Sequence, residues 1–528
     1  MRTQGVRRRA GGDRGRGRPE LTAAVARIWH ELIGTVAADD DDFFELGGDS
    51  LLATWAVARI QEELGIDVTL DDLFQRTRLS ELVAHLQTLP RAPRGDTPAA
   101  DADEGALTAA ERAVWLAAEV APQPTAYLIS VVVEVRGDLD ADLLEAALGD
   151  VTARHEALRT AFPLTGTEPR RRVVAPGRPH VTRVTEAAPP GPDRLRELAA
   201  EDIERPVDLE QAPLFRARLV TDGDRAVALL LTVHHAVFDA RSLELLVREL
   251  GACCDARLGG GAADLTPVPG PATAGARQRA WLAGPEGRRA VAELAGSLTG
   301  LPVAGPFPGA RPSDAVERAG AHWRGPVDED LARAVRRLAL RRGATLHMAG
   351  LAAFAVALAD WTGTEDLAVG AGFSGRTSPE AQNAIGCFVN VLPIRIRLRG
   401  PEPFADVLAR AREATLFVAR HQDVPFESLR ARLRQEGVAV PEVRVAFGAQ
   451  DVARPVHRGE KFELIGKEAD TGQARLDLTC WLEAAGEDDL QAFWTYRPGL
   501  LTSSDIADLH RRFIGALRDG TGTELAHS

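Results

Sequence analysis

The chain has 528 residues, of which 45% are hydrophobic and 26% are charged, and its formal net charge at pH 7 is −13. This length exceeds what one compact core holds, so the sequence predicts a multidomain protein of two to four domains. The negative charge argues against nucleic acid as the main partner, and no apolar run approaches the roughly 20 residues of a membrane-spanning helix.

The first twenty residues are rich in arginine and glycine, and no apolar segment follows them. Residues 1–20 are therefore predicted to be a disordered tail rather than a secretory signal. The four cysteines form neither a metal-binding nor a disulfide pattern; they are Cys253, Cys254, Cys387 and Cys480. We therefore expect no metal site and a reducing, cytoplasmic location.

Apolar residues at helical spacing predict a small four-helix domain over residues 21–87. It contains the segment Asp42-Phe-Phe-Glu-Leu-Gly-Gly-Asp-Ser-Leu-Leu52, and the apolar repeat that follows places Ser50 at the start of a helix. A serine there can be an ordinary N-cap, or it can carry a phosphate-linked arm, because a helix N-terminus favours phosphate. An N-cap does not require the whole segment, so the sequence favours an attachment site, with Gly47 and Gly48 leaving room for a modifying enzyme.

Residues 88–106 are rich in proline, alanine and aspartate and lack apolar periodicity. They are predicted to be a flexible linker that spans about 20–25 Å as a coil. From residue 107 to about residue 520, strands and helices alternate, which predicts an α/β (α+β) domain of two lobes. The Pro/Gly/Ala-rich stretch over 265–276 separates an N-lobe, about 107–270, from a C-lobe, about 277–520.

The elements of this second domain follow from apolar periodicity. Strands are predicted over 128–135, 226–233, 367–370, 391–398, 443–447 and 490–496, and helices over 140–155, 195–204, 243–250, 328–341, 346–362 and 404–420.

His234, His235 and Asp239 lie in a loop between a predicted strand and a predicted helix. A histidine transfers protons near neutral pH, and a nearby aspartate can fix its tautomer or brace the loop. By itself the HHxxxD pattern fits this catalytic interpretation and a non-functional one about equally well; the non-functional one is a structural histidine pair or a chance likeness to metal ligands.

Further segments give the HHxxxD pattern a context. They are Arg154-His-Glu-Ala-Leu-Arg-Thr-Ala-Phe162, Phe373-Ser-Gly-Arg-Thr377, Ile385-Gly-Cys-Phe-Val-Asn390 and His421-Gln-Asp-Val-Pro-Phe-Glu427. With these segments, residues 107–520 resemble a condensation domain of nonribosomal peptide synthesis. Residues 21–87 resemble a peptidyl carrier protein of the same machinery.

The resemblance implies a fold like that of chloramphenicol acetyltransferase, with two lobes and a tunnel between them. An amine would attack an acyl thioester in the tunnel and form an amide bond. His235 would be the central catalytic residue, while His234 and Asp239 would complete the motif in structural roles. Arg376 would pair with Asp239, Asn390 would line the tunnel, and His421 and Glu427 would stabilise the fold.

The resemblance also implies a cofactor and partners. Ser50 would carry 4′-phosphopantetheine, added by a phosphopantetheinyl transferase. The chain has no adenylation segment, so an adenylation enzyme would load the arm in trans. Because the carrier domain precedes the condensation domain, its arm would present the donor, and the acceptor would be a downstream carrier protein or a free amine.

The sequence departs from the family at Ala240, where glycine is usual. An alanine would cost about 1 kcal/mol if this position required a positive φ. Two other functions remain as alternatives. An epimerase-like domain would need an EGHGR-type segment, which the chain lacks, and a silent recruitment platform would typically lack the second histidine, which the chain retains as His235.

Overall fold

The structure is a computed structural model, and it describes residues 18–90, 103, 105–121, 123–186, 190–263, 265–301, 320–439, 443–450, 454–469, 474–484 and 490–525. The chain divides into two compact units, Met1–Gly95 and Asp96–Ser528. Most of the predicted tail and of the predicted linker lies outside the described residues.

Within residues 18–90, the first unit contains the four predicted helices: α1 (Arg18–Ile33), α2 (Ser50–Arg59), α3 (Leu70–Gln75) and α4 (Leu79–Leu86). A π-helical turn, η1 (Ile60–Leu64), continues α2 and ends at Gly65, whose φ of 63° reverses the chain. The helices close around buried aromatic rings. Trp29 meets Phe43 edge-on, with 5.0 Å between ring centroids, so the first half of the FFELGGDSLL segment belongs to the core.

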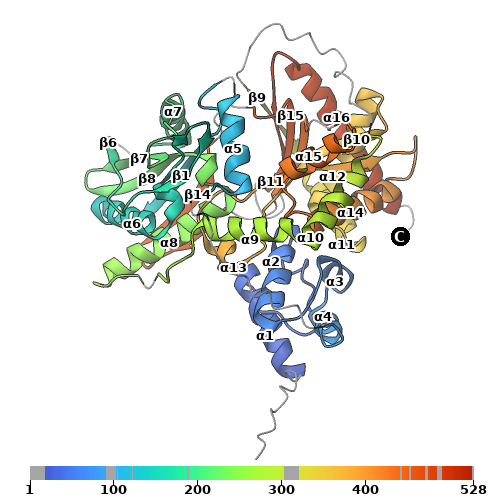
Figure 1. Cartoon of the computed structure of the whole chain (residues 1–528), viewed down its shortest axis with the longest axis horizontal. Coiled ribbons are helices and arrows are strands. Elements are labelled where there is room, and N and C mark those ends of the chain that lie inside the picture. The colour runs from blue at the N-terminus through green and yellow to red at the C-terminus, as the bar shows by residue number, and fades with distance from the viewer. Residues whose placement is uncertain are drawn as a thin grey trace, which may run out of the picture. The chain divides into compact units, whose positions relative to one another are not determined.

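The second unit contains two six-stranded sheets, and Figure 1 shows the helices that cover them. The strand order of the first sheet is β13-β14-β1-β8-β7-β6. Its strands are β1 (Leu128–Gly137), β6 (Val181–Thr185), β7 (Phe215–Asp222), β8 (Arg225–His234), β13 (Val456–Arg458) and β14 (Phe462–Glu468).

Helices α6 (Ala141–Arg154) and α8 (Ala240–Leu258) cover one face of this sheet, and α7 (Pro192–Ile203) covers the other. The faces alternate along the strands, as expected for a sheet that is buried on both sides. On β1, for example, Val131 and Val133 face α6 and α8, whereas Val132 faces α7.

The strand order of the second sheet is β11-β10-β12-β15-β16-β9. Its strands are β9 (Ala321–Val327), β10 (Asp366–Phe373), β11 (Asn390–Arg397), β12 (Val445–Gln450), β15 (Leu478–Ala484) and β16 (Leu490–Tyr496). The helices around it are α11 (Glu329–Arg341), α12 (Leu346–Thr362), α14 (Phe404–Arg420), α15 (Phe426–Gln435) and α16 (Ser503–Leu525). Most of α12 is buried, and it packs against α14, α16 and β12.

The remaining elements connect or flank the two sheets. They are α5 (Ala109–Glu119), η2 (Glu156–Arg159), η3 (His235–Val237), α9 (Pro271–Ala283), α10 (Pro285–Leu298), α13 (Pro379–Asn383), and the short ribbons β2 (Thr160–Ala161) with β5 (Arg172–Val173) and β3 (Leu164–Thr165) with β4 (Glu168–Pro169). Of the described helices, none is long and apolar enough to cross a membrane alone; α11 and α12 pass that test only as a pair, and this pair is bent by 108°.

The predicted α/β class and the two-lobed architecture are confirmed, but the lobes are not the two continuous segments that we expected. Strands β13 and β14 come from the predicted C-lobe sequence, yet β14 pairs with β1 in the N-lobe sheet. The connection between β10 and β11 also enters the N-lobe, where Ile385 and Cys387 are part of the buried core. Apolar periodicity reveals a strand or a buried segment, but it does not reveal the partner.

A buried ion pair holds the β10–β11 connection against the N-lobe. Arg376 Nη2 lies 2.7 Å from Asp239 Oδ1, and Arg376 Nε lies 3.3 Å from Asp239 Oδ2. The Arg376 side chain is fully buried and that of Asp239 nearly so. The predicted pairing of Asp239 with Arg376 is therefore confirmed.

Both members of the pair are held by further hydrogen bonds. Asp239 accepts from the backbone N–H groups of Ser242, at 3.0 Å, and Phe388, at 3.2 Å. Arg376 donates to the carbonyls of Ala381 and Ala384, and its guanidinium lies 4.3 Å from the centroid of the Phe388 ring. With these partners both buried charges are well compensated. If either Asp239 or Arg376 is removed, the remaining charge is left without its counter-ion in a low-dielectric interior.

We expect Asp239→Asn to lower the free energy of unfolding of the second unit by about 3–5 kcal/mol, because Arg376 would remain buried without its counter-ion. Urea denaturation of the full chain measures the change. Arg183→Gln is the matched control, since its ion pairs with Asp142 and Glu145 lie at the surface and should each contribute at most about 1 kcal/mol. The double variant Asp239→Asn/Arg376→Gln should lose less stability than the sum of the two single variants, and strict additivity would contradict the coupling.

Candidate functional site

The loop before α2 determines the position of Ser50. Asp49 is the N-cap of α2, and its carboxylate accepts from the backbone N–H of Leu52 at 2.8 Å. Ser50 is the first residue of the helix and is half-buried. The alternative role for Ser50, that of an ordinary N-cap, is therefore wrong.

The two glycines before Asp49 are required by the loop itself. Gly47 has a φ of 104°, a conformation that residues with a Cβ rarely adopt. A Cβ on Gly48 would lie 2.4 Å from the ring of Phe43 and 2.5 Å from its carbonyl oxygen. Loop conformation and close packing therefore require both glycines, and the access for a modifying enzyme that the sequence suggested stays a prediction.

The start of α2 suits a phosphodiester-linked arm. The helix dipole and the first N–H groups of a ten-residue helix favour a phosphate at this end. Because Asp49 performs the capping, an ester at the Ser50 hydroxyl would not remove the N-cap. The donor set at this helix start therefore fits 4′-phosphopantetheine.

The HHxxxD motif of the second unit forms a tight passage from strand to helix. His234 is the last residue of β8, η3 begins at His235, and Asp239 is the N-cap of α8. The backbone N–H of His234 donates to Leu214 at 2.9 Å, and that of His235 donates to Tyr127 at 2.8 Å. Both histidines therefore stand on hydrogen-bonded backbone at the end of the N-lobe sheet.

The backbone gives the two histidines opposite tautomers. His235 Nδ1 lies 2.7 Å from the carbonyl oxygen of Phe238, which can only accept, so Nδ1 carries the proton and Nε2 keeps its lone pair. In His234, Nδ1 accepts from the N–H of Ala236 at 3.2 Å, so the proton lies on Nε2. His235 is partly accessible to solvent and His234 is buried. Of the two, His235 is the one that presents a basic nitrogen beyond the loop.

Both imidazoles are held neutral. Burial, with further contributions from His235 and Arg475, lowers the pKa of His234 to about 3. Burial and then the positive charge of Arg475 lower the pKa of His235 to about 4, although the Phe238 carbonyl and Asp239 act in the opposite direction. At neutral pH the His235 Nε2 lone pair is therefore available to accept a proton.

Ala240 is the first residue of α8 and is exposed. A residue inside the first turn has helical dihedrals with negative φ, so alanine is unstrained here. The strain that we considered for this departure from glycine is therefore absent.

Two residues of the other segments bridge distant parts of the second unit. His155 Nδ1 accepts from the backbone N–H of Ile385 at 3.2 Å, and its Nε2 lies 2.7 Å from Glu249. Asn390 donates to the carbonyls of Gln422, at 2.9 Å, and Val424, at 2.7 Å. Asn390 thus fixes the backbone of the HQDVPFE segment, while the tunnel role predicted for it stays a prediction.

His421 makes the fold-stabilising contacts that the sequence predicted. Its Nδ1 lies 2.7 Å from the Phe417 carbonyl within α14, and its Nε2 lies 3.0 Å from Glu293 of α10. Glu427 lies in the first turn of α15. The described residues contain no group of three or more histidine, cysteine or carboxylate side chains that would hold a metal ion.

Sequence reasoning missed three residues of the site. Ser242 Oγ lies 2.9 Å from Asp239 and accepts from the backbone N–H of Gly386 at 3.0 Å, so it joins the two segments beside the ion pair. Tyr127 and Arg475 lie next to the histidines only because β1 pairs with β8, and the chain returns from β14 to β15 nearby. The spacing of Ser242 three residues after Asp239 was a usable signal, since helix caps accept from that position.

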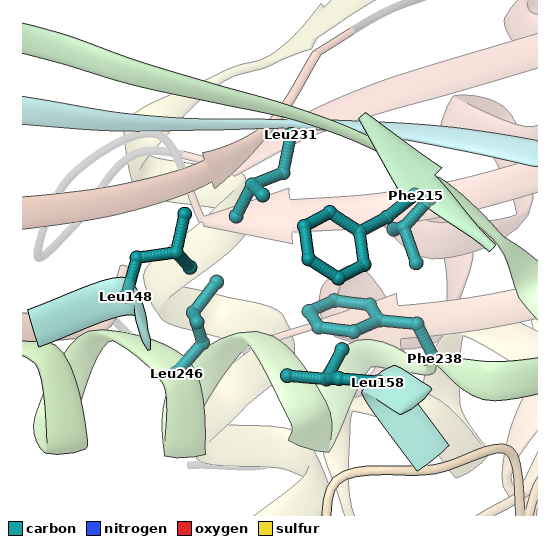
Figure 2. Close-up of a pocket in the computed structure, with 7 residues that line it drawn as sticks. Leu148, Leu158, Phe215, Leu231, Phe238 and Leu246 are labelled. Carbon is teal, nitrogen blue, oxygen red and sulfur yellow. The ribbon is translucent and has the colours of Figure 1, made fainter. Parts of the chain in front are cut away.

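A small apolar cavity lies behind the histidine loop. Its volume is about 10 Å³, and its walls are formed by Leu148, Leu158, Phe215, Leu231, Val233, Phe238 and Leu246 (Figure 2). This is roughly the space of one water molecule, but the walls offer it no polar partner. Figure 2 shows the Phe238 ring facing Phe215 across this space, so the residue whose carbonyl fixes His235 is anchored in the N-lobe core.

Four histidines with lowered pKa values should make the second unit sensitive to mild acid. Burial lowers the pKa of His234 to about 3 and of His235, His347 and His510 to about 4. The unfolded chain would bind protons below about pH 6.5, whereas the folded state would not, so stability should fall progressively as the pH drops from about 6.5 towards 4.

The melting temperature measured between pH 7 and pH 5, above the range where carboxylates titrate, checks this expectation. His347→Phe removes one titrating group beside Phe447 and should flatten the slope. His180→Gln is the control, because His180 is exposed and its removal should leave the slope unchanged. A melting temperature that is constant over this range would contradict the prediction.

Comparisons with known proteins agree with this geometry. Residues 101–453 match the family described as "Condensation domain", and residues 23–86 match the "Phosphopantetheine attachment site". The HHxxxD motif lies inside the first match, and Ser50 lies inside the second.

Relatives with known names are peptide synthetases. A linear gramicidin synthase polypeptide of Brevibacillus parabrevis is 32% identical over 520 residues, which cover 94% of this chain and 10% of that protein. AMB antimetabolite synthetase AmbB of Pseudomonas aeruginosa is 33% identical over 506 residues, covering 93% and 38%. Phosphinothricin tripeptide synthetase PhsB of Streptomyces viridochromogenes is 30% identical over 522 residues, covering 94% and 43%. The chain therefore spans less than half the length of each of these relatives.

Solved structures share the fold of the second unit. The first condensation domain of the CDA synthetase has a TM-score of 0.68 at 23% identity and covers 80% of this chain and 97% of that one. The X-domain from teicoplanin biosynthesis has a TM-score of 0.68 at 25% identity, covering 79% and 94%. The chain therefore belongs to the condensation-domain family of nonribosomal peptide synthetases, with a phosphopantetheine attachment domain ahead of its condensation domain.

Proposed function

We propose that this chain forms an amide bond by transferring an acyl or aminoacyl group from a thioester on its attachment domain to an amine. The observation that carries the proposal is the orientation of His235. Its Nδ1–H is fixed on the Phe238 carbonyl, which leaves Nε2 with a lone pair on a neutral, partly accessible ring. A positioned base of this kind typically contributes about 10²–10⁴ in rate.

In this proposal each residue of the motif has a separate duty. His235 accepts the amine proton as the C–N bond forms, or aligns the amine for attack. His234 is buried and neutral and anchors the loop. Asp239 does not reach the reacting atoms, because its oxygens are occupied by Arg376, Ser242 and Phe388; it holds the start of α8 and thereby the loop.

We assign the arm to Ser50, at the first position of α2. When attached, 4′-phosphopantetheine supplies the thiol that carries the acyl group as a thioester. The chain's contribution at this end is a capped helix start that favours the phosphate and a loop that holds the serine outside the buried core.

The partners follow from the same proposal. A phosphopantetheinyl transferase would modify Ser50, an adenylation enzyme would load it in trans, and the acceptor would be a downstream carrier protein or a free amine. We propose a cytoplasmic location, with which the four unpaired, buried cysteines are compatible. The arm of the preceding domain would present the donor, because a tether raises its local concentration at the site that it can reach.

Two competing functions would give different results in the experiments below. A recruitment platform would not depend on His235; one solved structure of similar fold is a complex of the X-domain and OxyB from teicoplanin biosynthesis, in which such a domain binds a second protein. An epimerase would exchange the α-hydrogen of the loaded aminoacyl group without releasing it.

We expect Ser50→Ala to abolish modification of the chain. Incubation with coenzyme A and a broad-specificity phosphopantetheinyl transferase should add the mass of one arm to the wild type and nothing to the variant, because the variant has no hydroxyl in the first turn of α2. Ser80→Ala, on α4 of the same unit, is the control and should be modified like the wild type. Intact mass spectrometry measures the addition, and a modified Ser50→Ala chain would place the arm elsewhere.

We expect His235→Ala to slow amide formation by about 10²–10⁴-fold without lowering the melting temperature appreciably. Among the described residues, the His235 side chain forms its hydrogen bond within its own loop, to the Phe238 carbonyl. The assay loads the wild-type arm with an isotopically labelled, N-blocked aminoacyl group and adds an amine in trans. An N-blocked group cannot act as an acceptor, so label that moves to the amine identifies the loaded arm as the donor. His180→Ala, an exposed histidine, is the control.

The outcomes separate the competing functions. Label that stays on the wild-type chain, while an unblocked aminoacyl group gains mass from a partner thioester, would make the arm an acceptor. Full activity of His235→Ala would remove the proposed role of that residue. Absence of transfer in either direction, with retained binding of another protein, would favour the platform.

A further inference from the structure

Arg475 lies beside the histidine loop without belonging to any of the segments that the sequence singled out. It precedes β15, in the stretch by which the chain returns from the N-lobe sheet to the second sheet, and its side chain is exposed. Its guanidinium carbon lies 5.8 Å from the centroid of the Tyr127 ring, and its Nε lies 3.5 Å from the carbonyl of Ala126.

Tyr127 connects Arg475 to the histidines. The Tyr127 carbonyl accepts from the backbone N–H of His235 at 2.8 Å, and the next residue, Leu128, pairs with His234 across β1 and β8. A cation that rests on residues 126–127 is therefore held next to the HHxxxD loop by the pairing of two strands.

Within the part of the chain that the structure describes, Arg475 lies beside the histidine loop without an ion-pair partner. The carboxylates around the loop are paired: Asp239 with Arg376, and Glu111 of the adjacent α5 with Arg171. Glu249 of α8 contacts His155 and Arg154, and Asp477, two residues beyond Arg475, pairs with Arg444 and Arg497. Among the described residues, no carboxylate forms an ion pair with Arg475.

The field of this charge reaches the site. Arg475 contributes to the lowered pKa of both histidines. For His235 it is the second cause, after burial. For His234 it is the third, after burial and the neighbouring His235. It also opposes the effect of burial on the pKa of Tyr127. A fixed positive charge raises the free energy of an imidazolium, and it does so more strongly where neighbouring carboxylates are already neutralised.

We propose that Arg475 is a positioning residue whose positive charge adds to burial in disfavouring a protonated His235, so that the ring quickly passes on to the departing sulfur the proton that it takes from the amine. This inference rests on the proposed function. In the step, the amine nitrogen forms the C–N bond and gives one proton to Nε2, the C–S bond breaks, and the same proton leaves on the sulfur. The imidazole is neutral before and after the step. A nearby positive charge destabilises the imidazolium and so favours release of the proton to the sulfur.

The first test is independent of turnover. Histidine labelled with ¹³C in the imidazole ring is titrated by NMR in the full chain, and His235→Ala assigns the His235 signal. Arg475→Gln removes the charge and should move the His235 midpoint upward by about half a pH unit or more. Arg475→Lys keeps the charge but loses the fork that reaches Ala126, and it should leave the midpoint near that of the wild type. Arg178→Gln, an exposed arginine on an N-lobe loop, is the control and should change nothing.

The second test follows the reaction. The ratio of the Arg475→Gln rate to the wild-type rate should stay constant from pH 8 to about pH 6 and fall between about pH 6 and pH 5, because the variant retains protons on His235 sooner. Ionisation of the amine cancels in the ratio. The Arg475→Lys ratio should stay flat. An unchanged His235 midpoint in Arg475→Gln, or equal effects of the glutamine and lysine variants, would overturn the role of the charge. Full activity of His235→Ala would instead overturn the proposed function, while the NMR titration would still decide whether Arg475 acts on that ring.

Discussion

The site depends on one buried ion pair. Asp239 and Arg376 are 137 residues apart in the chain, and their contact joins the first turn of α8 to the connection between β10 and β11. One Asp239 oxygen receives Arg376 Nη2 and the Ser242 N–H, and the other receives Arg376 Nε and the Phe388 N–H. The same carboxylate therefore ends the histidine loop and anchors the crossing segment, so the loop conformation and the lobe contact cannot be lost independently.

The two reactive residues that we propose, Ser50 and His235, are placed by a similar device. In each case an aspartate accepts from the N–H three residues later and caps a helix: Asp49 at 2.8 Å from Leu52 N, and Asp239 at 3.0 Å from Ser242 N. Because Asp49 and Asp239 cap the helices, the Ser50 hydroxyl and the His235 imidazole are not needed as caps. Local capping rules therefore place both helix starts, while tertiary contacts such as the Asp239–Arg376 pair hold the histidine loop in the second unit.

The sequence predicted local features well and pairings poorly. Helices α12 and α14 were predicted with their observed bounds, since α14 has a regular apolar stripe and α12 is a long, almost continuously apolar run between Thr345 and Gly363. The Asp239–Arg376 pair followed from the family motifs. Six strands of the two large sheets were missed: β6, β7, β9, β13, β14 and β15. The entry of β14 into the N-lobe sheet was missed as well, because a strand's partner is decided by three-dimensional packing. Arg475 was missed for the same reason: only the β1–β8 pairing brings it near His235.

The balance of charges around His235 has a consequence for its chemistry. Asp239 is committed to Arg376, so it supplies little of the stabilisation that a carboxylate gives to an imidazolium, and the remaining nearby charge, Arg475, is positive. A histidine in such a field is a weak base: it is unprotonated at neutral pH, so its lone pair is free, but its protonated form is unstable. That property suits a relay between an amine and a thiolate, whereas permanent deprotonation of an ammonium ion would need a stronger base. The electrostatics therefore favour a substrate amine that arrives already neutral, with His235 handling only the proton released as the amide bond forms.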